Sequence, residues 1–184
     1  MVARSPDTPE RGMQAVRRTG GPVVPTQELD IRYRLDIFAS SVVDVVTCVG
    51  GWLFDRVMAG WDVTVIVAEF PDGRPVQILG ADTLDLESKL ASMGHRPRPQ
   101  TVAVACDLFG SDLRVRKSVL QALGDGLTEV ALWGDTCPAA FGHRVDPVQY
   151  QLSSAARAFK VQALMAAAAP VALAGSAETF LTTR

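Results

Sequence analysis

Hydrophobic and β-branched residues run almost without interruption through the segment DVTVIVAEF at residues 62–70. A strand that is apolar on both faces is typical of a sheet covered by other elements on both sides. Residues 71–74 (PDGR) have the composition of a turn, and residues 75–79 form a second, shorter apolar run. The pattern predicts an antiparallel hairpin at about residues 62–79, inserted in an α/β sheet.

Apolar residues recur at helical spacing after Ser41, at positions 42, 45, 46, 49, 53 and 57. Ser41 is followed three residues later by Asp44, which resembles a capping box with the shorter Asp in place of Glu. The pattern predicts a helix that ends near Ala59, just before Gly60, a residue type that often terminates helices.

This predicted helix contains two consecutive glycines, Gly50 and Gly51, near its middle. Together they cost roughly 2 kcal/mol of stability relative to alanine, so their presence needs a structural reason. One interpretation is close backbone packing against a neighbouring element. The other is that a ligand or a partner subunit approaches the backbone at this point.

Strand patterns and helix patterns alternate along the rest of the chain. Residues 32–38 alternate polar and apolar side chains, which predicts an edge or one-sided strand with Asp36 facing water, and residues 101–106 and 129–133 are expected to be buried strands. Alternating strands and helices favour parallel connections. We therefore expect a single three-layer α/β domain, with a mostly parallel sheet of five or six strands that contains the hairpin.

The longest predicted helix begins at Asp146 and Pro147, with Asp as its cap and Pro at its first position. Its inner face is expected to hold Phe159 and its outer face Lys160. From residue 161 to 169 the segment is almost entirely apolar, and it includes Leu164 and Met165. Such a segment must be covered, either by residues 171–183 or by another subunit.

The first 28 residues differ in composition from the rest of the chain. They contain four prolines, a Gly-Gly pair and scattered arginines, with few apolar residues. This composition predicts a disordered tail over residues 1–28, followed by the α/β domain over residues 29–184.

The charge balance gives no general reason to bind a polyanion. Eighteen basic and twenty acidic residues leave a formal net charge of −2. We therefore expect neither nucleic acid nor an anionic membrane as a partner. No apolar run approaches the roughly 20 residues that a membrane span needs, and no signal core is present. Three cysteines without C-x-x-C spacing are typical of a reduced, cytoplasmic protein.

Acidic residues follow two of the predicted buried strands. Asp107 comes directly after the first, and Asp135 comes two residues after the second. Ligands of open α/β sheets bind outside the carboxyl ends of the strands. If the two strands are neighbours, both acids lie on one rim, with His143 and Arg144 from the following loop. Such a rim provides a carboxylate, a base and an anion-binding group.

Known catalytic and cofactor motifs are missing from the sequence. It has no G-x-G-x-x-G fingerprint after a strand, no G-x-x-x-x-G-K-[ST] loop and no G-x-S-x-G elbow. The only two histidines, His95 and His143, lie in different predicted loops, which does not favour a zinc site. We therefore expect no cofactor and no metal.

Two hypotheses for the function follow. The first is a non-catalytic cytoplasmic module that binds a protein partner or its own copy. It rests on the missing motifs and on a predicted homodimer surface at Gly50, Gly51, Leu164 and Met165. The alternative is a small enzyme, or a protein that binds a small anion or metabolite, which uses the rim of Asp107, Asp135, His143 and Arg144.

Overall fold

The computed structural model describes residues 32–69, 72–92, 97–134, 138–142 and 145–183. In this part of the chain seven strands form one sheet in the order β3-β2-β1-β4-β5-β7-β6. The strands are β1 (Arg34–Ala39), β2 (Asp62–Val67), β3 (Asp82–Asp85), β4 (Thr101–Ala105), β5 (Glu129–Trp133), β6 (Val145–Gln151) and β7 (Ala177–Thr183). Strands β1 to β5 pair in parallel, and β7 pairs antiparallel with both β5 and β6. The predicted fold class is confirmed, with seven strands in place of five or six. The predicted tail at residues 1–28 lies outside the described residues.

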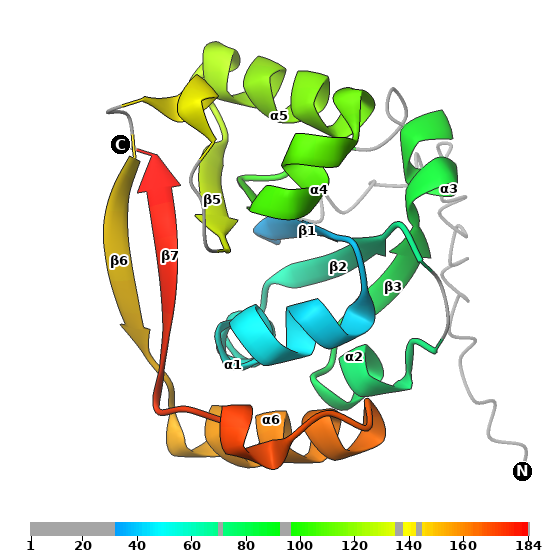
Figure 1. Ribbon diagram of the computed structural model, residues 1–184, viewed down its shortest axis with the longest axis vertical. Coiled ribbons are helices and arrows are strands. Elements are labelled where there is room, and N and C mark those ends of the chain that lie inside the picture. The colour runs from blue at the N-terminus through cyan, green and yellow to red at the C-terminus, as the bar shows by residue number, and fades with distance from the viewer. Residues whose placement is uncertain (1–31, 70–71, 93–96, 135–137, 143–144, 184) are drawn as a thin grey trace, which may run out of the picture. The chain divides into compact units, whose positions relative to one another are not determined.

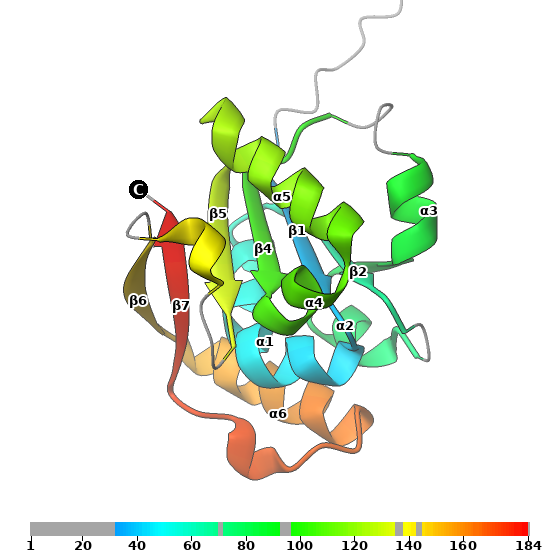
Figure 2. The same ribbon diagram turned by 45° about the horizontal axis from the view of Figure 1, so that its top comes forward.

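Helices cover both faces of the sheet (Figure 1). One face carries α1 (Val42–Met58), α2 (Arg74–Ile78) and α6 (Ser154–Ala166), and the other carries α3 (Leu86–Ala91), α4 (Cys106–Ser111) and α5 (Leu113–Asp125). Two short 3-10 helices, η1 (Ala139–Phe141) and η2 (Val171–Leu173), complete the described elements. None of the helices in the described residues combines the length and the apolar character that a membrane span requires. The tilted view in Figure 2 shows α4 and α5 lying over β4 and β1.

The central strand β1 is covered on both sides, so its prediction as a strand with one exposed side is wrong. Leu35 and Ile37 are fully buried, and Asp36 between them is also buried. The Asp36 carboxylate is neutralised by Lys89 of α3, whose Nζ donates to its Oδ2 at 2.5 Å. The polar position of Asp36 in the alternating pattern of β1 therefore belongs to a buried ion pair and does not face solvent.

The predicted hairpin at residues 62–79 is wrong in position. β2 is a buried parallel strand as expected, but residues 74–78 form the short helix α2, with Gly73 as N-cap and Pro75 in its first turn. Proline is well suited to the first turn of a helix, where its missing N–H has no intrahelical partner. The antiparallel pairs among the described strands are β5 with β7 and β6 with β7, and in both pairs the strands are adjacent in space but far apart in sequence.

The predicted helix start at Asp146 and Pro147 is also wrong, because both residues belong to β6. β6 lies at the edge of the sheet, where a strand tolerates a proline. Helix α6 begins after Ser153, whose hydroxyl accepts from the amide of Ala156. The Ser153 hydroxyl in turn donates to Asp55 of α1 at 2.6 Å, which fixes this turn against α1.

Gly50 and Gly51 pack closely against other parts of the same chain. A Cβ atom on Gly51 would lie 2.6 Å from Leu152 Cδ2, and one on Gly50 would lie 3.3 Å from Leu79 Cδ1. Real Cβ atoms do not come as close as the first distance. Close backbone packing within one chain is therefore sufficient to explain the two glycines.

The same region of α1 holds a buried ion pair. Lys160 of α6 and Glu178 of β7 lie 2.6 Å apart with side chains 2% exposed, so the predicted outward position of Lys160 is wrong. Glu178 accepts from the Gly51 amide, and Lys160 donates to the Thr47 carbonyl. In an uninterrupted α-helix this amide and this carbonyl would bond to each other. Glu178 and Lys160 thus serve as hydrogen-bond partners for this amide and this carbonyl of α1.

The apolar end of α6 is covered only in part. Leu164 is fully buried, so it does not face outward as the predicted homodimer surface requires, whereas Met165 is 61% exposed. Phe159, expected on the inner face, is 44% exposed and stacks on Phe54. Association of two copies stays a prediction that the described residues do not test.

Candidate functional site

A cleft of about 410 Å³ opens at the carboxyl ends of β4 and β5, beside the first turns of α1. We call it the strand-end cleft. It is lined by Asp44, Cys48, Ala105, Cys106, Asp107, Trp133 and Gly134. Open α/β sheets bind ligands at this end of their strands, because the loops there leave a crevice that backbone amides and helix starts surround. The cleft is therefore the candidate functional site.

Asp44 lies in the first turn of α1, which Ser41 caps by accepting from the Asp44 amide at 3.3 Å. Asp44 is one of the residues that line the cleft. Its Oδ2 accepts from Trp133 Nε1 at 3.0 Å, and its Oδ1 accepts from Cys48 Sγ at 3.4 Å. Burial raises the pKa of Asp44 above its usual value, and the nearby Asp107 charge adds to this, while the hydrogen bonds from Trp133 and Cys48 oppose it.

Cys48 follows Asp44 by one helical turn, so the two side chains lie on the same face of α1. Burial, followed by the negative charge of Asp44, raises the pKa of the Cys48 thiol to about 12. A thiol with such a pKa stays protonated at neutral pH and is not an activated nucleophile. It acts here as a hydrogen-bond donor that orients Asp44.

Asp107 follows β4 and begins the short helix α4. Its Oδ2 accepts from Ser40 Oγ at 2.7 Å, and its Oδ1 accepts from the amide of Leu108, also at 2.7 Å. Ser40 follows β1, so the hydrogen bond joins the ends of two neighbouring strands. Asp107 is exposed, whereas Asp44 is partly buried, so the cleft holds two carboxylates in different environments.

Of the four residues predicted to form the binding rim, Asp107 lies in the cleft. Asp135, His143 and Arg144 lie outside the described residues. β4 and β5 are neighbours in the sheet, as the prediction required, and the role of Asp107 in binding stays a prediction.

The sequence interpretation missed Asp44 and its partners Trp133 and Cys48. It assigned Asp44 to helix capping because of its spacing from Ser41. One signal was present: an Asp side chain is shorter than the Glu of a capping box, so it is less able to reach back to the cap amide. Trp133 gave no signal, since its indole meets Asp44 only because the two residues, 89 positions apart, are brought together by the fold.

No three His, Cys, Asp or Glu side chains within the described residues come together as a metal ion would require.

No family model matches this chain, and no curated protein matches its sequence. Similar structures do exist. One is the A40926 pseudoaglycone deacetylase, with a TM-score of 0.55 and 19% identity over 83% of this chain and 97% of the other. Another is a deacetylase in complex with teicoplanin, with a TM-score of 0.59 and 14% identity over 81% and 97% of the two chains. A third is the 4-carboxy-2-hydroxymuconate hydratase of Pseudomonas putida, with a TM-score of 0.55 and 12% identity over 82% and 95%.

These three neighbours are enzymes, and their similarity to this chain shows a common fold. The finding contradicts our first hypothesis, a non-catalytic module that acts by binding proteins, and our leaning against an enzyme. The absence of known motifs was a poor guide, because a catalytic site needs only suitable side chains at suitable distances. The alternative hypothesis, a small enzyme or metabolite-binding protein that uses the strand ends, agrees better with these neighbours.

Proposed function

We propose that the protein is an enzyme that activates a water molecule for hydrolysis or addition, with Asp44 of the strand-end cleft as the general base. The observation that carries the proposal is the Asp44 carboxylate, which lines the cleft, has a raised pKa and is oriented by Trp133 and Cys48. A carboxylate with a raised pKa is a stronger base at neutral pH than an ordinary one, which suits it to proton transfer.

The hydrogen bonds of Asp44 leave room for a water molecule. A carboxylate has about four lone-pair sites, of which the indole and the thiol occupy two. The remaining lone pairs accept a hydrogen bond from water in the cleft and then its proton as the oxygen attacks the substrate. The protonated carboxyl afterwards returns the proton to the leaving group or to the adjacent carbon.

Asp107 has the second role in this proposal. Its two oxygens are held by Ser40 and the Leu108 amide, and its side chain is exposed at the cleft. It orients a donor group of the substrate, such as a hydroxyl or an amide N–H. Asp135, His143 and Arg144 remain proposed substrate-binding residues, supported by their position within ten residues after Gly134, which lines the cleft.

The names of the similar structures support this class of reaction. Deacetylation is the attack of water on an acyl group, and hydration is the addition of water to a double bond, so both need an activated water molecule. We propose a small molecule as the substrate and the cytoplasm as the location. The cytoplasmic location is supported by the sequence, whose three cysteines have no C-x-x-C spacing.

The test compares Asp44→Asn with wild type. Purified protein is incubated with N-acetyl-D-glucosamine and N-acetylglycine, with acetate release followed by NMR, and with fumarate, with hydration followed by loss of the alkene signal. Asp44→Asn should lower kcat/KM by about 10²- to 10⁴-fold. Asp82→Asn, at an exposed position at the start of β3, is the matched control and should be unchanged. Full activity in Asp44→Asn, or no turnover of any of these compounds by wild type, contradicts the proposal.

A further inference from the structure

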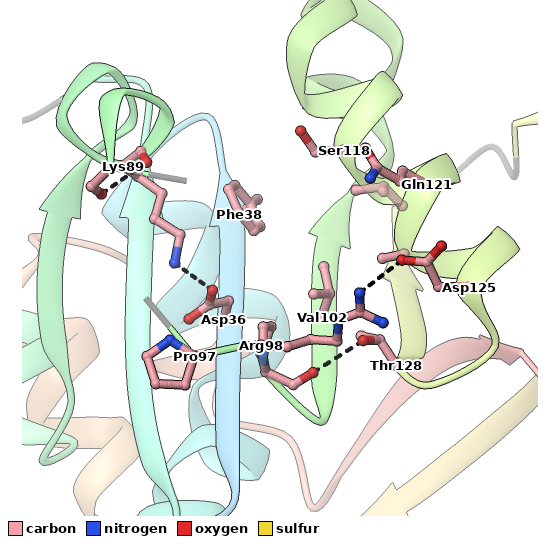
Figure 3. A pocket seen from close by; sticks show the side chains of 14 residues that line it. Asp36, Phe38, Lys89, Pro97, Arg98, Val102, Ser118, Gln121, Asp125 and Thr128 are labelled. Carbon is pink, nitrogen blue, oxygen red and sulfur yellow. Dashed lines mark hydrogen bonds and ion pairs between the residues drawn. The ribbon is translucent and has the colours of Figure 1, made fainter. Parts of the chain in front are cut away.

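A second cavity, of about 320 Å³, lies between α3 and α5 on their face of the sheet (Figure 3). We call it the amino-end cavity, because Arg98 and Thr128, which precede β4 and β5, form one end of it. Its floor is made by Asp36 and Phe38 of β1 and Val102 of β4, and its two sides by α3 and α5. None of its lining residues belongs to the strand-end cleft.

The charged side chains of this cavity neutralise one another. Lys89 pairs with Asp36 at 2.5 Å, and Arg98 pairs with Asp125 at 3.0 Å. The described lining residues therefore contribute two positive and two negative charges, which sum to zero. A charged ligand would need a compensating charge that these pairs already use, and burying it beside them would be costly. This arrangement favours a neutral ligand.

The buried ion pair retains hydrogen-bonding capacity toward the cavity. Among the described residues, Lys89 Nζ donates one hydrogen bond, to Asp36 Oδ2, although an ammonium carries three N–H groups. Asp36 Oδ1 accepts no hydrogen bond there. A spare donor and a spare acceptor thus lie side by side at the cavity, where Figure 3 shows both side chains. A hydroxyl group, which both donates and accepts, matches this pair better than a purely accepting or purely donating group.

The rest of the lining suits the carbon skeleton of such a ligand. Phe38, Val102 and Pro97 give the cavity an apolar surface beside the Asp36–Lys89 pair. A ring that carries hydroxyl groups on its edge and C–H groups on its faces can hydrogen-bond the ion pair and also contact the apolar residues. The volume lies at the lower end of the range for small-molecule pockets, about 300 to 1,000 Å³, which corresponds to a single ring and not to an oligomer.

We propose that the amino-end cavity binds a neutral, hydroxyl-rich ring the size of a monosaccharide or a cyclic polyol. The Asp36–Lys89 pair hydrogen-bonds its hydroxyl groups, and Phe38 and Val102 contact its carbon face. This site is separate from the strand-end cleft, so the inference does not depend on the proposed reaction.

The experiment measures binding of D-ribose and myo-inositol to the full chain by protein-observed NMR, with D-ribose 5-phosphate as the charged counterpart of one probe. Both neutral compounds should shift the amide signals of β1, α3 and α5, and leave those of residues 105–107 and 133–134 unchanged. The dissociation constants should be in the millimolar range, as expected for small ligands with few non-hydrogen atoms. D-ribose 5-phosphate should bind more weakly than D-ribose.

Two variants locate the site. Ala122 lines the cavity, so Ala122→Leu should fill part of it and weaken binding of D-ribose at least tenfold. Ala158→Leu, at an exposed position on α6 outside the cavity, is the matched control and should bind as wild type does. If circular dichroism shows that Ala122→Leu is not folded, Gln121→Tyr on the same side of the cavity replaces it.

Three results would overturn the proposal. The first is that neither neutral probe shifts the signals of β1, α3 and α5. The second is that D-ribose 5-phosphate binds as tightly as D-ribose or more tightly, which would show an anion site. The third is that a folded blocking variant binds the neutral probes as wild type does.

Discussion

The Asp44 carboxylate shows how one residue can satisfy a local sequence rule and still have another role. Its amide completes the cap of α1, as the spacing from Ser41 predicted. Its side chain instead meets Trp133 and Cys48 in the strand-end cleft. A capping pattern therefore fixes where a helix begins, but it does not say where the carboxylate of that turn points.

Asp44 should make the stability of the protein depend on pH. Burial raises the pKa of its carboxyl in the folded protein above the ordinary value of 3.8. In the interval between these two pKa values the folded state binds more protons than the unfolded state, so the free energy of unfolding falls as the pH rises through the interval. Above the raised pKa this contribution stays constant.

In the variant Asp44→Asn the side chain cannot ionise. Its free energy of unfolding should therefore not show the decline that Asp44 causes as the pH rises. Urea unfolding of wild type and variant, from acid to neutral pH, measures the difference between their stability curves. Asp82→Asn, at an exposed position, should follow wild type. Parallel curves for wild type and Asp44→Asn would show that the Asp44 carboxyl titrates normally.

At the scale of elements, the sequence predicts the positions of several helices and strands correctly, but it predicts the wrong type for two of them. Helix α1 and strands β2, β4 and β5 lie where their patterns placed them. The sequence predicts a strand where α2 lies, because five residues are too few to separate a period of 2 from a period of 3.6. The sequence predicts the first turns of a helix where β6 lies, because Asp followed by Pro is typical of a helix start.

Two helical glycines, one closely packed and one without neighbours, allow a matched test of packing. Gly51 in α1 is pressed against Leu152, whereas Gly124 in α5 has nothing within 4 Å of the place where a Cβ would lie. Gly51→Ala should lower the free energy of unfolding by about 1 to 3 kcal/mol through overpacking. Gly124→Ala should raise it by up to about 1 kcal/mol, because alanine favours the helix.

Chemical denaturation of the two variants and wild type measures both effects. The substitution is the same in each, so a difference in sign isolates the contact with Leu152. If Gly51→Ala is as stable as wild type, Leu152 can move away at little cost, and close packing does not explain this glycine.

At the scale of the whole molecule, α1, α6 and β7 meet at the buried pair of Lys160 and Glu178. Glu178 bonds the Gly51 and Trp52 amides, and Lys160 bonds the Thr47 carbonyl. Both residues lie in the last third of the chain, while the backbone they contact lies in the first. The pair thereby joins the C-terminal strand and helix to the parallel part of the domain.

Removing one member of this pair should be far more harmful than removing a surface partner. Lys160→Met leaves Glu178 buried without its countercharge and should cost about 3 to 5 kcal/mol. Arg114→Met, which removes a half-exposed Arg that pairs with Glu87 and Asp112, should cost less than about 1 kcal/mol. Thermal and urea unfolding of both variants checks this, and equal costs would show that the buried pair contributes no more than a surface one.

The sequence by itself determined the α/β class, the buried strands and the position of Asp107 at a strand end, because these depend on local composition and on the periodicity of apolar residues. Only the tertiary structure decided the strand order, the reach of Trp133 to Asp44, and the burial of Asp36, Lys89 and Lys160. Trp133, Asp36 and Lys160 each have a hydrogen-bond partner that lies more than 50 positions away in the sequence. A pattern of apolar and polar positions reports whether a side chain suits water, but a charge becomes suited to the interior when the fold places its countercharge beside it.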